Sequence, residues 1–145
     1  MTARSTARAR WNGALADGQG TVTTDSPALD GASITWKART GGEAGTTPEE
    51  LLAAGHAACF SMALTGALAK ADHAPEQLDV TATYTFGPSD DGFAISSIEL
   101  AVEATVPGIE EDAFLEFADG AKVGCPVSKA LSVPISLDAR LLQTA

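Results

Sequence analysis

Residues 47–68 read TPEELLAAGHAACFSMALTGAL, and this stretch decides the fold. Thr47 is suited to cap a helix, Pro48 to occupy its first position, and Glu50 to complete a capping box with Thr47. Beyond that first turn, residues 51–68 carry no charge. A helix that is apolar all round either crosses a membrane or lies buried in a protein core. The acidic start and the interspersed polar side chains favour a buried central helix, covered by a sheet on one side and by something else on the other.

The residues before this helix alternate in the manner of strands. Apolar and polar side chains alternate over residues 9–13 and 33–39, and the run 21–24 lies between them after a Gly-Gln-Gly turn. The glycine-rich segment 40–46 then leads to the helix as a loop. We therefore expect a three-stranded antiparallel sheet at the start of the chain.

After the helix the strand pattern returns and is followed by a second helical stripe. In order, the sequence predicts a strand over 78–86, a turn over 88–92, a strand over 93–106, a helix over 109–121, a short helix over 126–131 and a strand over 135–141. This order predicts the α+β class, with antiparallel sheets packed around a long buried central helix. We expect residues 1–145 to form a single domain.

Composition narrows the classes of function. The chain has 145 residues and a formal net charge of −10, which argues against binding nucleic acid or an anionic membrane surface. Its two cysteines are too few for a disulfide-scaffolded secreted domain or a four-cysteine zinc site. The N-terminal arginines are followed by no apolar core of a signal peptide. We expect a soluble cytoplasmic protein whose cysteines are reduced.

The two cysteines are the first candidates for chemistry. Cys59 lies midway along the uncharged helix, and Cys125 lies at a Gly-Cys-Pro helix start. Both could simply be small core residues, because free cysteine is among the most buried types. At a helix N-terminus, however, the unpaired N–H groups favour the thiolate, which makes Cys125 the stronger candidate on physical grounds.

The histidines allow two further hypotheses, both weaker. A metal site could draw on His56, Cys59, Cys125 and His73, but the two histidines have no recognised zinc spacing. A Cys–His hydrolase could use His56 as the base for Cys59, although residues at i and i+3 rarely adopt the nucleophile–base geometry.

Arg39 and Glu49 do not stand out on the residues alone. Arg39, before a glycine loop, is typical of a solvated surface charge. Glu49, in the first turn of the helix, is typical of a carboxylate favoured by the helix dipole.

Two long motifs resemble the osmotically inducible protein C (OsmC) family. They are residues 45–64 (GTTPEELLAAGHAACFSMAL) and residues 121–131 (AKVGCPVSKAL). The resemblance also includes residues 11–13, residues 105–109 and the last strand, so it covers nearly the whole chain. The absence of arginine from residues 17–20 and the Pro-Val-Ser sequence after Cys125 favour the OsmC branch over the organic hydroperoxide resistance branch.

The resemblance implies a fold, a partner and an activity. It implies an intertwined homodimer and a thiol-dependent peroxidase that reduces organic hydroperoxides, and hydrogen peroxide more weakly, to alcohols or water. Cys59 would be the peroxidatic cysteine and form a sulfenic acid, and Cys125 would resolve it as a disulfide. Arg39 would favour the thiolate, and Glu49 would orient Arg39. An external thiol or dithiol would reduce the disulfide, and no metal or other cofactor would be needed.

An alternative function on the same fold stays open at this point. The chain could bind a hydrophobic, lipid-like ligand without peroxidase turnover, in an apolar pocket of the dimer lined by Phe60, Met62 or other aromatic residues. Formation of a disulfide on exposure to peroxide distinguishes the two functions, because a carrier has no reason to form one.

Overall fold

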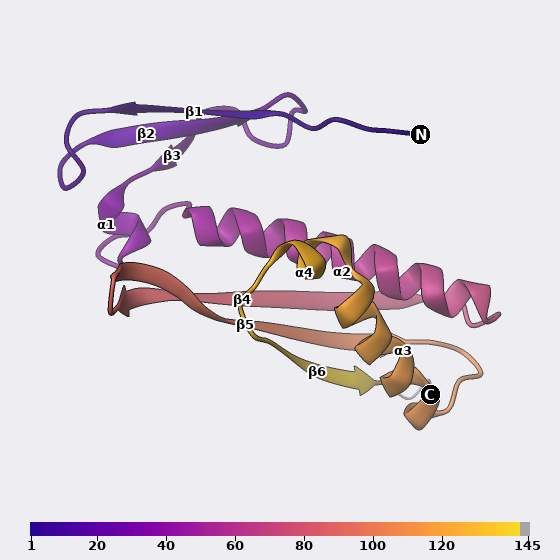
Figure 1. Cartoon of the computed structure of the whole chain (residues 1–145). Helices are drawn as coiled ribbons and strands as arrows, with labels where there is room; N and C mark the ends of the chain where they lie inside the picture. The colour runs from indigo at the N-terminus through magenta and orange to yellow at the C-terminus, as the bar shows by residue number, and fades with distance from the viewer. Residues whose placement is uncertain (143–145) are drawn as a thin grey trace. The chain divides into compact units, whose positions relative to one another are not determined.

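The computed structural model describes residues 1–142 of the chain (Figure 1). Contacts divide it into two compact units, Met1–Leu51 and the chain from Leu52 onward. The first unit contains a three-stranded sheet in the order β1-β2-β3, as the sequence predicts. Both pairs of strands are antiparallel. The strands are β1 (Ala7–Asn12), β2 (Gln19–Thr24) and β3 (Ala32–Ile34).

The third predicted strand is shorter than expected. The prediction of a strand over 33–39 is wrong beyond Ile34, because residues Trp36–Arg39 form a helical turn, α1. The Thr35 hydroxyl accepts a hydrogen bond from the Ala38 N–H at 3.0 Å and so caps that turn. An alternating pattern cannot reveal this, since a threonine that bonds locally to the backbone competes with strand pairing.

The central helix forms where the sequence predicts it. α2 spans Pro48–Lys70, and its start is capped by the Thr47 hydroxyl, which accepts the Glu50 N–H at 3.0 Å. By length and hydropathy α2 could also cross a membrane. In this chain its two sides differ: Phe60 and Leu64 are fully buried, whereas Met62 is 71% exposed. The prediction that α2 is buried on all sides is therefore confirmed for only one of its sides within this chain.

The second unit is built on a mixed sheet in the order β4-β5-β6. β4 (Gln77–Ser89) and β5 (Gly92–Thr105) form a long antiparallel hairpin. β6 (Ile135–Leu141) pairs with β5 in parallel, so the expectation of purely antiparallel sheets is wrong here. The reason is the connection: α3 (Glu111–Gly124) and α4 (Pro126–Ala130) lie between the two strands, and a crossover of this length returns the chain in the same direction.

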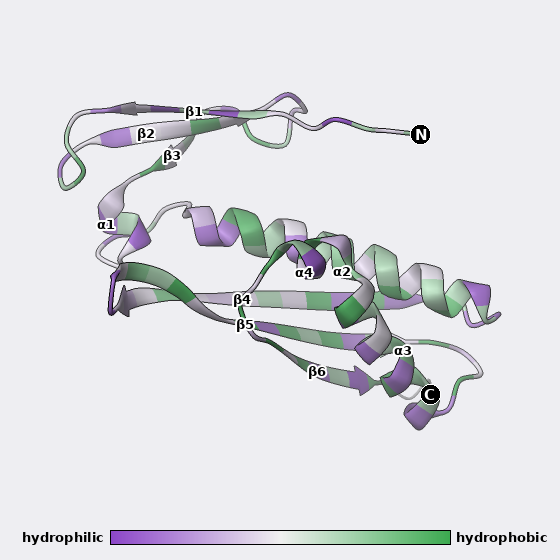
Figure 2. Cartoon of the chain, in the orientation of Figure 1, coloured by the Kyte–Doolittle hydropathy of each residue, from purple (hydrophilic) through white to green (hydrophobic). Residues whose placement is uncertain are grey.

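One face of this sheet carries the core. From Ile98 to Ala104, β5 alternates strictly between buried apolar side chains and exposed side chains, and Figure 2 shows alternating bands along the strand. The buried side chains pack with one side of α2 and with α3. The principal core residues are Phe60, Leu64, Leu68, Leu100, Val102, Ala104, Phe114 and Ala118. This arrangement confirms the α+β class and brings the middle of α2 to the junction between α3 and α4.

Candidate active site

The fold of the second unit brings the two cysteines together. Cys59 lies on α2, and Cys125 lies between α3 and α4, where it ends one helix and begins the next. Both are reduced, and they lie close enough for each thiol to shift the pKa of the other. Cys125 is fully buried, whereas Cys59 is partly exposed. The pair therefore has one fully buried thiol and one that is partly exposed and packs against the core.

The surroundings of the two thiols favour charge on Cys125. Burial raises the pKa of Cys59, and its hydrogen bond to Cys125 raises that pKa further. Burial also raises the pKa of Cys125, but the Ser128 N–H, the Cys59 thiol and the Ser128 hydroxyl outweigh burial, so that the net pKa of Cys125 is lowered. None of these contacts is a regular capping hydrogen bond between the Cys125 side chain and the start of α4. The expectation that the helix start favours a Cys125 thiolate is confirmed.

Arg39 and Glu49 form an ion pair within the first unit. The Arg39 Nη2 donates to Glu49 Oε1 at 2.8 Å, and the Arg39 Nε lies 3.2 Å from Oε1 and 3.3 Å from Oε2. The Glu49 side chain is only 7% exposed, compared with 33% for Arg39. A fork of this kind fixes the plane of the guanidinium. The predicted pairing of the two residues is confirmed.

A cavity of about 290 Å³ lies beside Arg39 in the same unit. Its walls are mostly apolar and include both tryptophans of the chain. The lining residues are Trp11, Leu15, Ile34, Thr35, Trp36, Arg39 and Pro48. A pocket with apolar walls and one cation suits a small molecule that has an apolar body and a polar end.

The pocket residues suggested by the sequence lie elsewhere. Phe60 is fully buried in the core, and Met62 is exposed on the outer side of α2. Neither lines the cavity beside Arg39. Within the single chain they therefore form no part of this cavity, and the suggestion of a pocket in a dimer stays a prediction. The sequence did not single out Trp11 of β1 or Trp36 of α1 as pocket residues.

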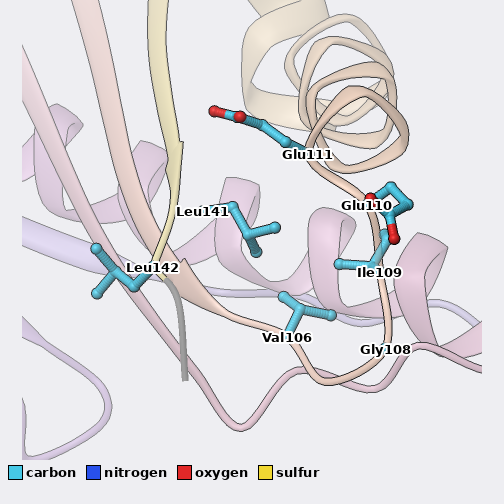
Figure 3. A pocket seen from close by; sticks show the side chains of 7 residues that line it. All are labelled: Val106, Gly108, Ile109, Glu110, Glu111, Leu141 and Leu142. Atoms are coloured by element: carbon cyan, nitrogen blue, oxygen red, sulfur yellow. The ribbon is translucent and has the colours of Figure 1, made fainter. Parts of the chain in front are cut away.

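A larger cavity, of about 420 Å³, lies at the start of α3 (Figure 3). It is lined by Val106, Gly108, Ile109, Glu110, Glu111, Leu141 and Leu142. No thiol, histidine or cationic side chain contributes to this lining, so size alone does not make it a reactive site.

His56 is not placed to serve Cys59. Its ring is fully buried, with Nδ1 2.7 Å from the Tyr84 hydroxyl and Nε2 2.8 Å from the Ser128 hydroxyl. Because both nitrogens are occupied by other partners, the geometry contradicts the hydrolase hypothesis. In the described residues, 1–142, no group of three His, Cys, Asp or Glu side chains could hold a metal ion. Tyr84 and Ser128 were not singled out by the sequence, since each has only its ordinary strand or helix pattern.

Comparison with known proteins gives a consistent result. The family model for OsmC-like proteins matches residues 40–139. The chain is 44% identical over 141 residues to Peroxiredoxin OsmC of Escherichia coli (strain K12), covering 97% of this chain and 99% of that protein. It is 31% identical over 112 residues to the organic hydroperoxide resistance protein OhrB of Bacillus subtilis, covering 77% and 80% of the two chains.

Solved structures agree with this assignment. The crystal structure of OhrB of Bacillus subtilis superposes with a TM-score of 0.66 at 25% identity, over 94% of this chain and 98% of that one. An OsmC-like protein of Mycoplasma pneumoniae has the same fold, with a TM-score of 0.75 at 22% identity, over 99% and 100% of the two chains. A family match over most of the chain, a relative of 44% identity over nearly its whole length, and the shared fold together place this chain in the OsmC family.

Proposed function

We propose that this protein is a thiol-dependent peroxidase that reduces organic hydroperoxides to alcohols. The observation that carries the proposal is the contact between Cys59 and Cys125, two thiols brought together by the fold from distant parts of the sequence. The relative with 44% identity is named a peroxiredoxin, and others are named organic hydroperoxide resistance proteins. The proposed reaction involves no nucleic acid, and the net charge of −10 also disfavours binding to phosphate groups.

The first step is oxidation of Cys59. Its thiolate attacks an oxygen of the hydroperoxide, the O–O bond breaks, and the alkoxide takes up a proton and leaves as the alcohol. Cys59 becomes a sulfenic acid. Cys59 is the better placed of the two thiols to meet substrate, because it is partly exposed and Cys125 is fully buried.

The second step forms the disulfide. Cys125 attacks the Cys59 sulfur, the S–O bond breaks, and hydroxide leaves as water. An external thiol or dithiol then reduces the Cys59–Cys125 disulfide and restores both thiols. We propose that no metal or organic cofactor takes part, and that the protein works in the reducing cytoplasm, where such thiols are available.

Arg39 and Glu49 supply the electrostatics of the first step in this proposal. Burial and Cys125 both raise the pKa of Cys59, so its thiolate needs a cation when it attacks. We assign that role to Arg39, with Glu49 holding its guanidinium in one orientation. The pocket beside Arg39 would hold the apolar group of the substrate, which favours organic hydroperoxides over hydrogen peroxide.

We further propose that residues 1–145 act as one OsmC-like domain and that two copies form a homodimer. The outer side of α2 is uncharged and exposed in the single chain, with Leu52 at 40% and Met62 at 71% exposure. A second copy would remove this apolar surface from water.

Oxidation of the purified protein tests the proposal. Cumene hydroperoxide should consume both thiols of each chain, yield an intramolecular disulfide and release the alcohol. Cys59→Ser should abolish turnover, whereas Ser61→Ala, which changes a neighbouring side chain on α2 that bonds only to the Ala57 carbonyl, should retain it. Reduction of organic hydroperoxides by Cys59→Ser at the wild-type rate would contradict the mechanism. Ligand binding without disulfide formation would indicate a carrier instead.

A further inference from the structure

A fully buried histidine lies at the centre of the second unit and has no part in the steps above. His56 is 0% exposed, yet both of its ring nitrogens have partners: the Tyr84 hydroxyl at 2.7 Å and the Ser128 hydroxyl at 2.8 Å. The Tyr84 ring also packs edge-on against the imidazole, with centroids 5.9 Å apart. Such complete pairing of a buried polar group is costly to disturb and fixes the position of each hydroxyl.

Ser128 connects this histidine to the redox pair. It lies three residues after Cys125, on α4, and its hydroxyl hydrogen-bonds to the Cys125 sulfur. The hydrogen bonds therefore form a continuous row: Tyr84 from β4, His56 from α2, Ser128 from α4, and Cys125. Three segments distant in sequence contribute its members, with Ser128 and Cys125 both at the start of α4, and the row ends on a reacting atom.

The donor and acceptor roles along this row of hydrogen bonds can be exchanged without movement of heavy atoms. With Cys125 as thiolate, Tyr84 donates to Nδ1, Nε2–H donates to Ser128, and Ser128 donates to sulfur. With Cys125 as thiol, the sulfur donates to Ser128, Ser128 donates to Nε2, and Nδ1–H donates to Tyr84. Each member can both donate and accept, so both states of Cys125 are fully bonded.

We propose that Ser128 and His56 transfer the proton of Cys125 during disulfide formation, with Ser128 as a catalytic residue and His56 as a positioning residue that acts through it. The proposal rests on the peroxidase function above. In the reduced pair the sulfurs share a proton, which moves from Cys59 to Cys125 as Cys59 attacks the peroxide. Cys125 must then lose it before it can attack in turn.

The row supplies the acceptor for that second step. The Cys125 S–H bond breaks as its proton passes to Ser128 Oγ, while the Ser128 proton passes to His56 Nε2. The freed electron pair on Cys125 forms the S–S bond, and the Cys59 S–O bond breaks. The departing hydroxide takes up the proton that His56 gives back through Ser128 and leaves as water, so His56 is neutral again. Cys125 sulfur is oxidised and Cys59 sulfur is reduced, so no outside oxidant enters this step.

The surroundings of the row suit a neutral, transiently charged imidazole. Burial lowers the pKa of His56, so it returns a proton readily. Burial raises the pKa of Tyr84, and the negative charge of Cys125 raises it further, so Tyr84 keeps its proton. The titratable groups facing the row are Tyr84 from β4, His56 and Cys59 from α2, and Cys125 itself. Among residues 1–142, no carboxylate or ammonium group hydrogen-bonds to its members.

The test follows the two oxidation steps separately in the full chain. After rapid mixing with one equivalent of cumene hydroperoxide, a dimedone label reports the Cys59 sulfenic acid, and the intact mass reports the disulfide. In Ser128→Ala, the sulfenic acid should form at least as fast as in the wild type, because Cys125 without its donors accepts the shared proton more readily. Closure of the disulfide should slow about tenfold near neutral pH and should accelerate with rising pH more steeply than in the wild type.

Matched variants separate chemistry from structural damage. Ser128→Thr keeps the hydroxyl and should restore closure, and Ser132→Ala, an exposed serine four positions on, should leave both steps unchanged. Tyr84→Phe keeps the ring and should shift the pH profile of closure, which keeps the idea testable if Ser128→Ala folds poorly. Wild-type closure with a wild-type pH profile in these variants, or equal slowing of both steps, would overturn the relay. Absence of sulfenic acid and disulfide in the wild type would instead refute the peroxidase function.

Discussion

The ion pair between Arg39 and Glu49 should be strongly coupled, and a double-mutant cycle measures that coupling. The variants are Arg39→Gln, Glu49→Gln and their combination, which remove each charge while keeping similar side-chain size. An internal control exists in the same unit: Arg8 and Asp25 also pair at 3.1 Å, but their side chains are 68% and 58% exposed. The two pairs have comparable distances and differ mainly in burial.

The expected magnitude follows from the geometry. Glu49 accepts from two guanidinium nitrogens of Arg39 and is almost wholly buried. A hydrogen bond to a charged group contributes about 1.5–3 kcal/mol. Because a third of the Arg39 side chain is exposed and screened by solvent, we expect a coupling equal to one such bond, about 1.5–3 kcal/mol. The exposed control pair should give less than about 1 kcal/mol.

Urea unfolding followed by tryptophan fluorescence is the suitable assay. Both tryptophans, Trp11 and Trp36, belong to the first unit, so their emission reports on the part of the chain that contains the pair. Arg39→Gln should be the more destabilising single change, since it leaves a buried carboxylate without its cation. A coupling no larger than that of Arg8 and Asp25 would refute the view that burial makes this pair strong.

Four further outcomes are expected. Cys125→Ser should leave an oxidised Cys59 that mass spectrometry detects as an added oxygen; formation of a disulfide within the single chain is then impossible, and rapid loss of the sulfenic acid without reductant would argue against Cys125 as the resolving residue. Leu15→Ala should raise KM for cumene hydroperoxide about fivefold, from about 1 kcal/mol of lost apolar contact, with no change for hydrogen peroxide; equal effects on both would separate this pocket from substrate binding. Met62→Glu should convert a dimer to monomers in sedimentation experiments, whereas Thr83→Glu on an exposed strand position should not; a monomeric wild type would contradict the dimer. The pKa of His56 is lowered by burial, so below its ordinary value of 6.5 the unfolded chain binds a proton that the folded chain does not, and the free energy of unfolding should fall as pH decreases; His56→Gln should remove that part of the pH dependence, and an identical slope in both proteins would contradict it.

Much of the local structure could be predicted because it depends on neighbouring residues. The cap at Thr47, the proline at the start of α2 and the strict alternation along β5 each act within a few positions, and all appear in the structure. The helical turn after Thr35 and the parallel pairing of β6 could not be predicted in the same way. The helical turn depends on the hydrogen-bond partner of the Thr35 hydroxyl. The parallel pairing of β6 depends on the path of the whole connection between β5 and β6.

In the candidate site, too, some residues could be identified from sequence motifs and others only from the fold. The two motifs around Cys59 and Cys125 identified both thiols, and the family resemblance added Arg39 and Glu49, which the residues alone would not have distinguished from ordinary surface and helix-start charges. The roles of His56, Tyr84 and Ser128 had no comparable signal. His56 lies three residues before Cys59, and this spacing suggested a base for that thiol. In the fold the His56 ring instead bonds to Tyr84 on β4 and Ser128 on α4.

The long uncharged stretch of the central helix, the two cysteines and the motifs of the family can be recognised from the sequence alone, because residue type and short spacing carry them. Which of the two thiols has the lower pKa depends on the tertiary structure. Cys59 and Cys125 are the same amino acid, and their pKa values move in opposite directions because hydrogen bonds outweigh burial at Cys125 but not at Cys59. Desolvation and hydrogen bonding depend on which groups surround each thiol, and those neighbours are set only when the chain has folded.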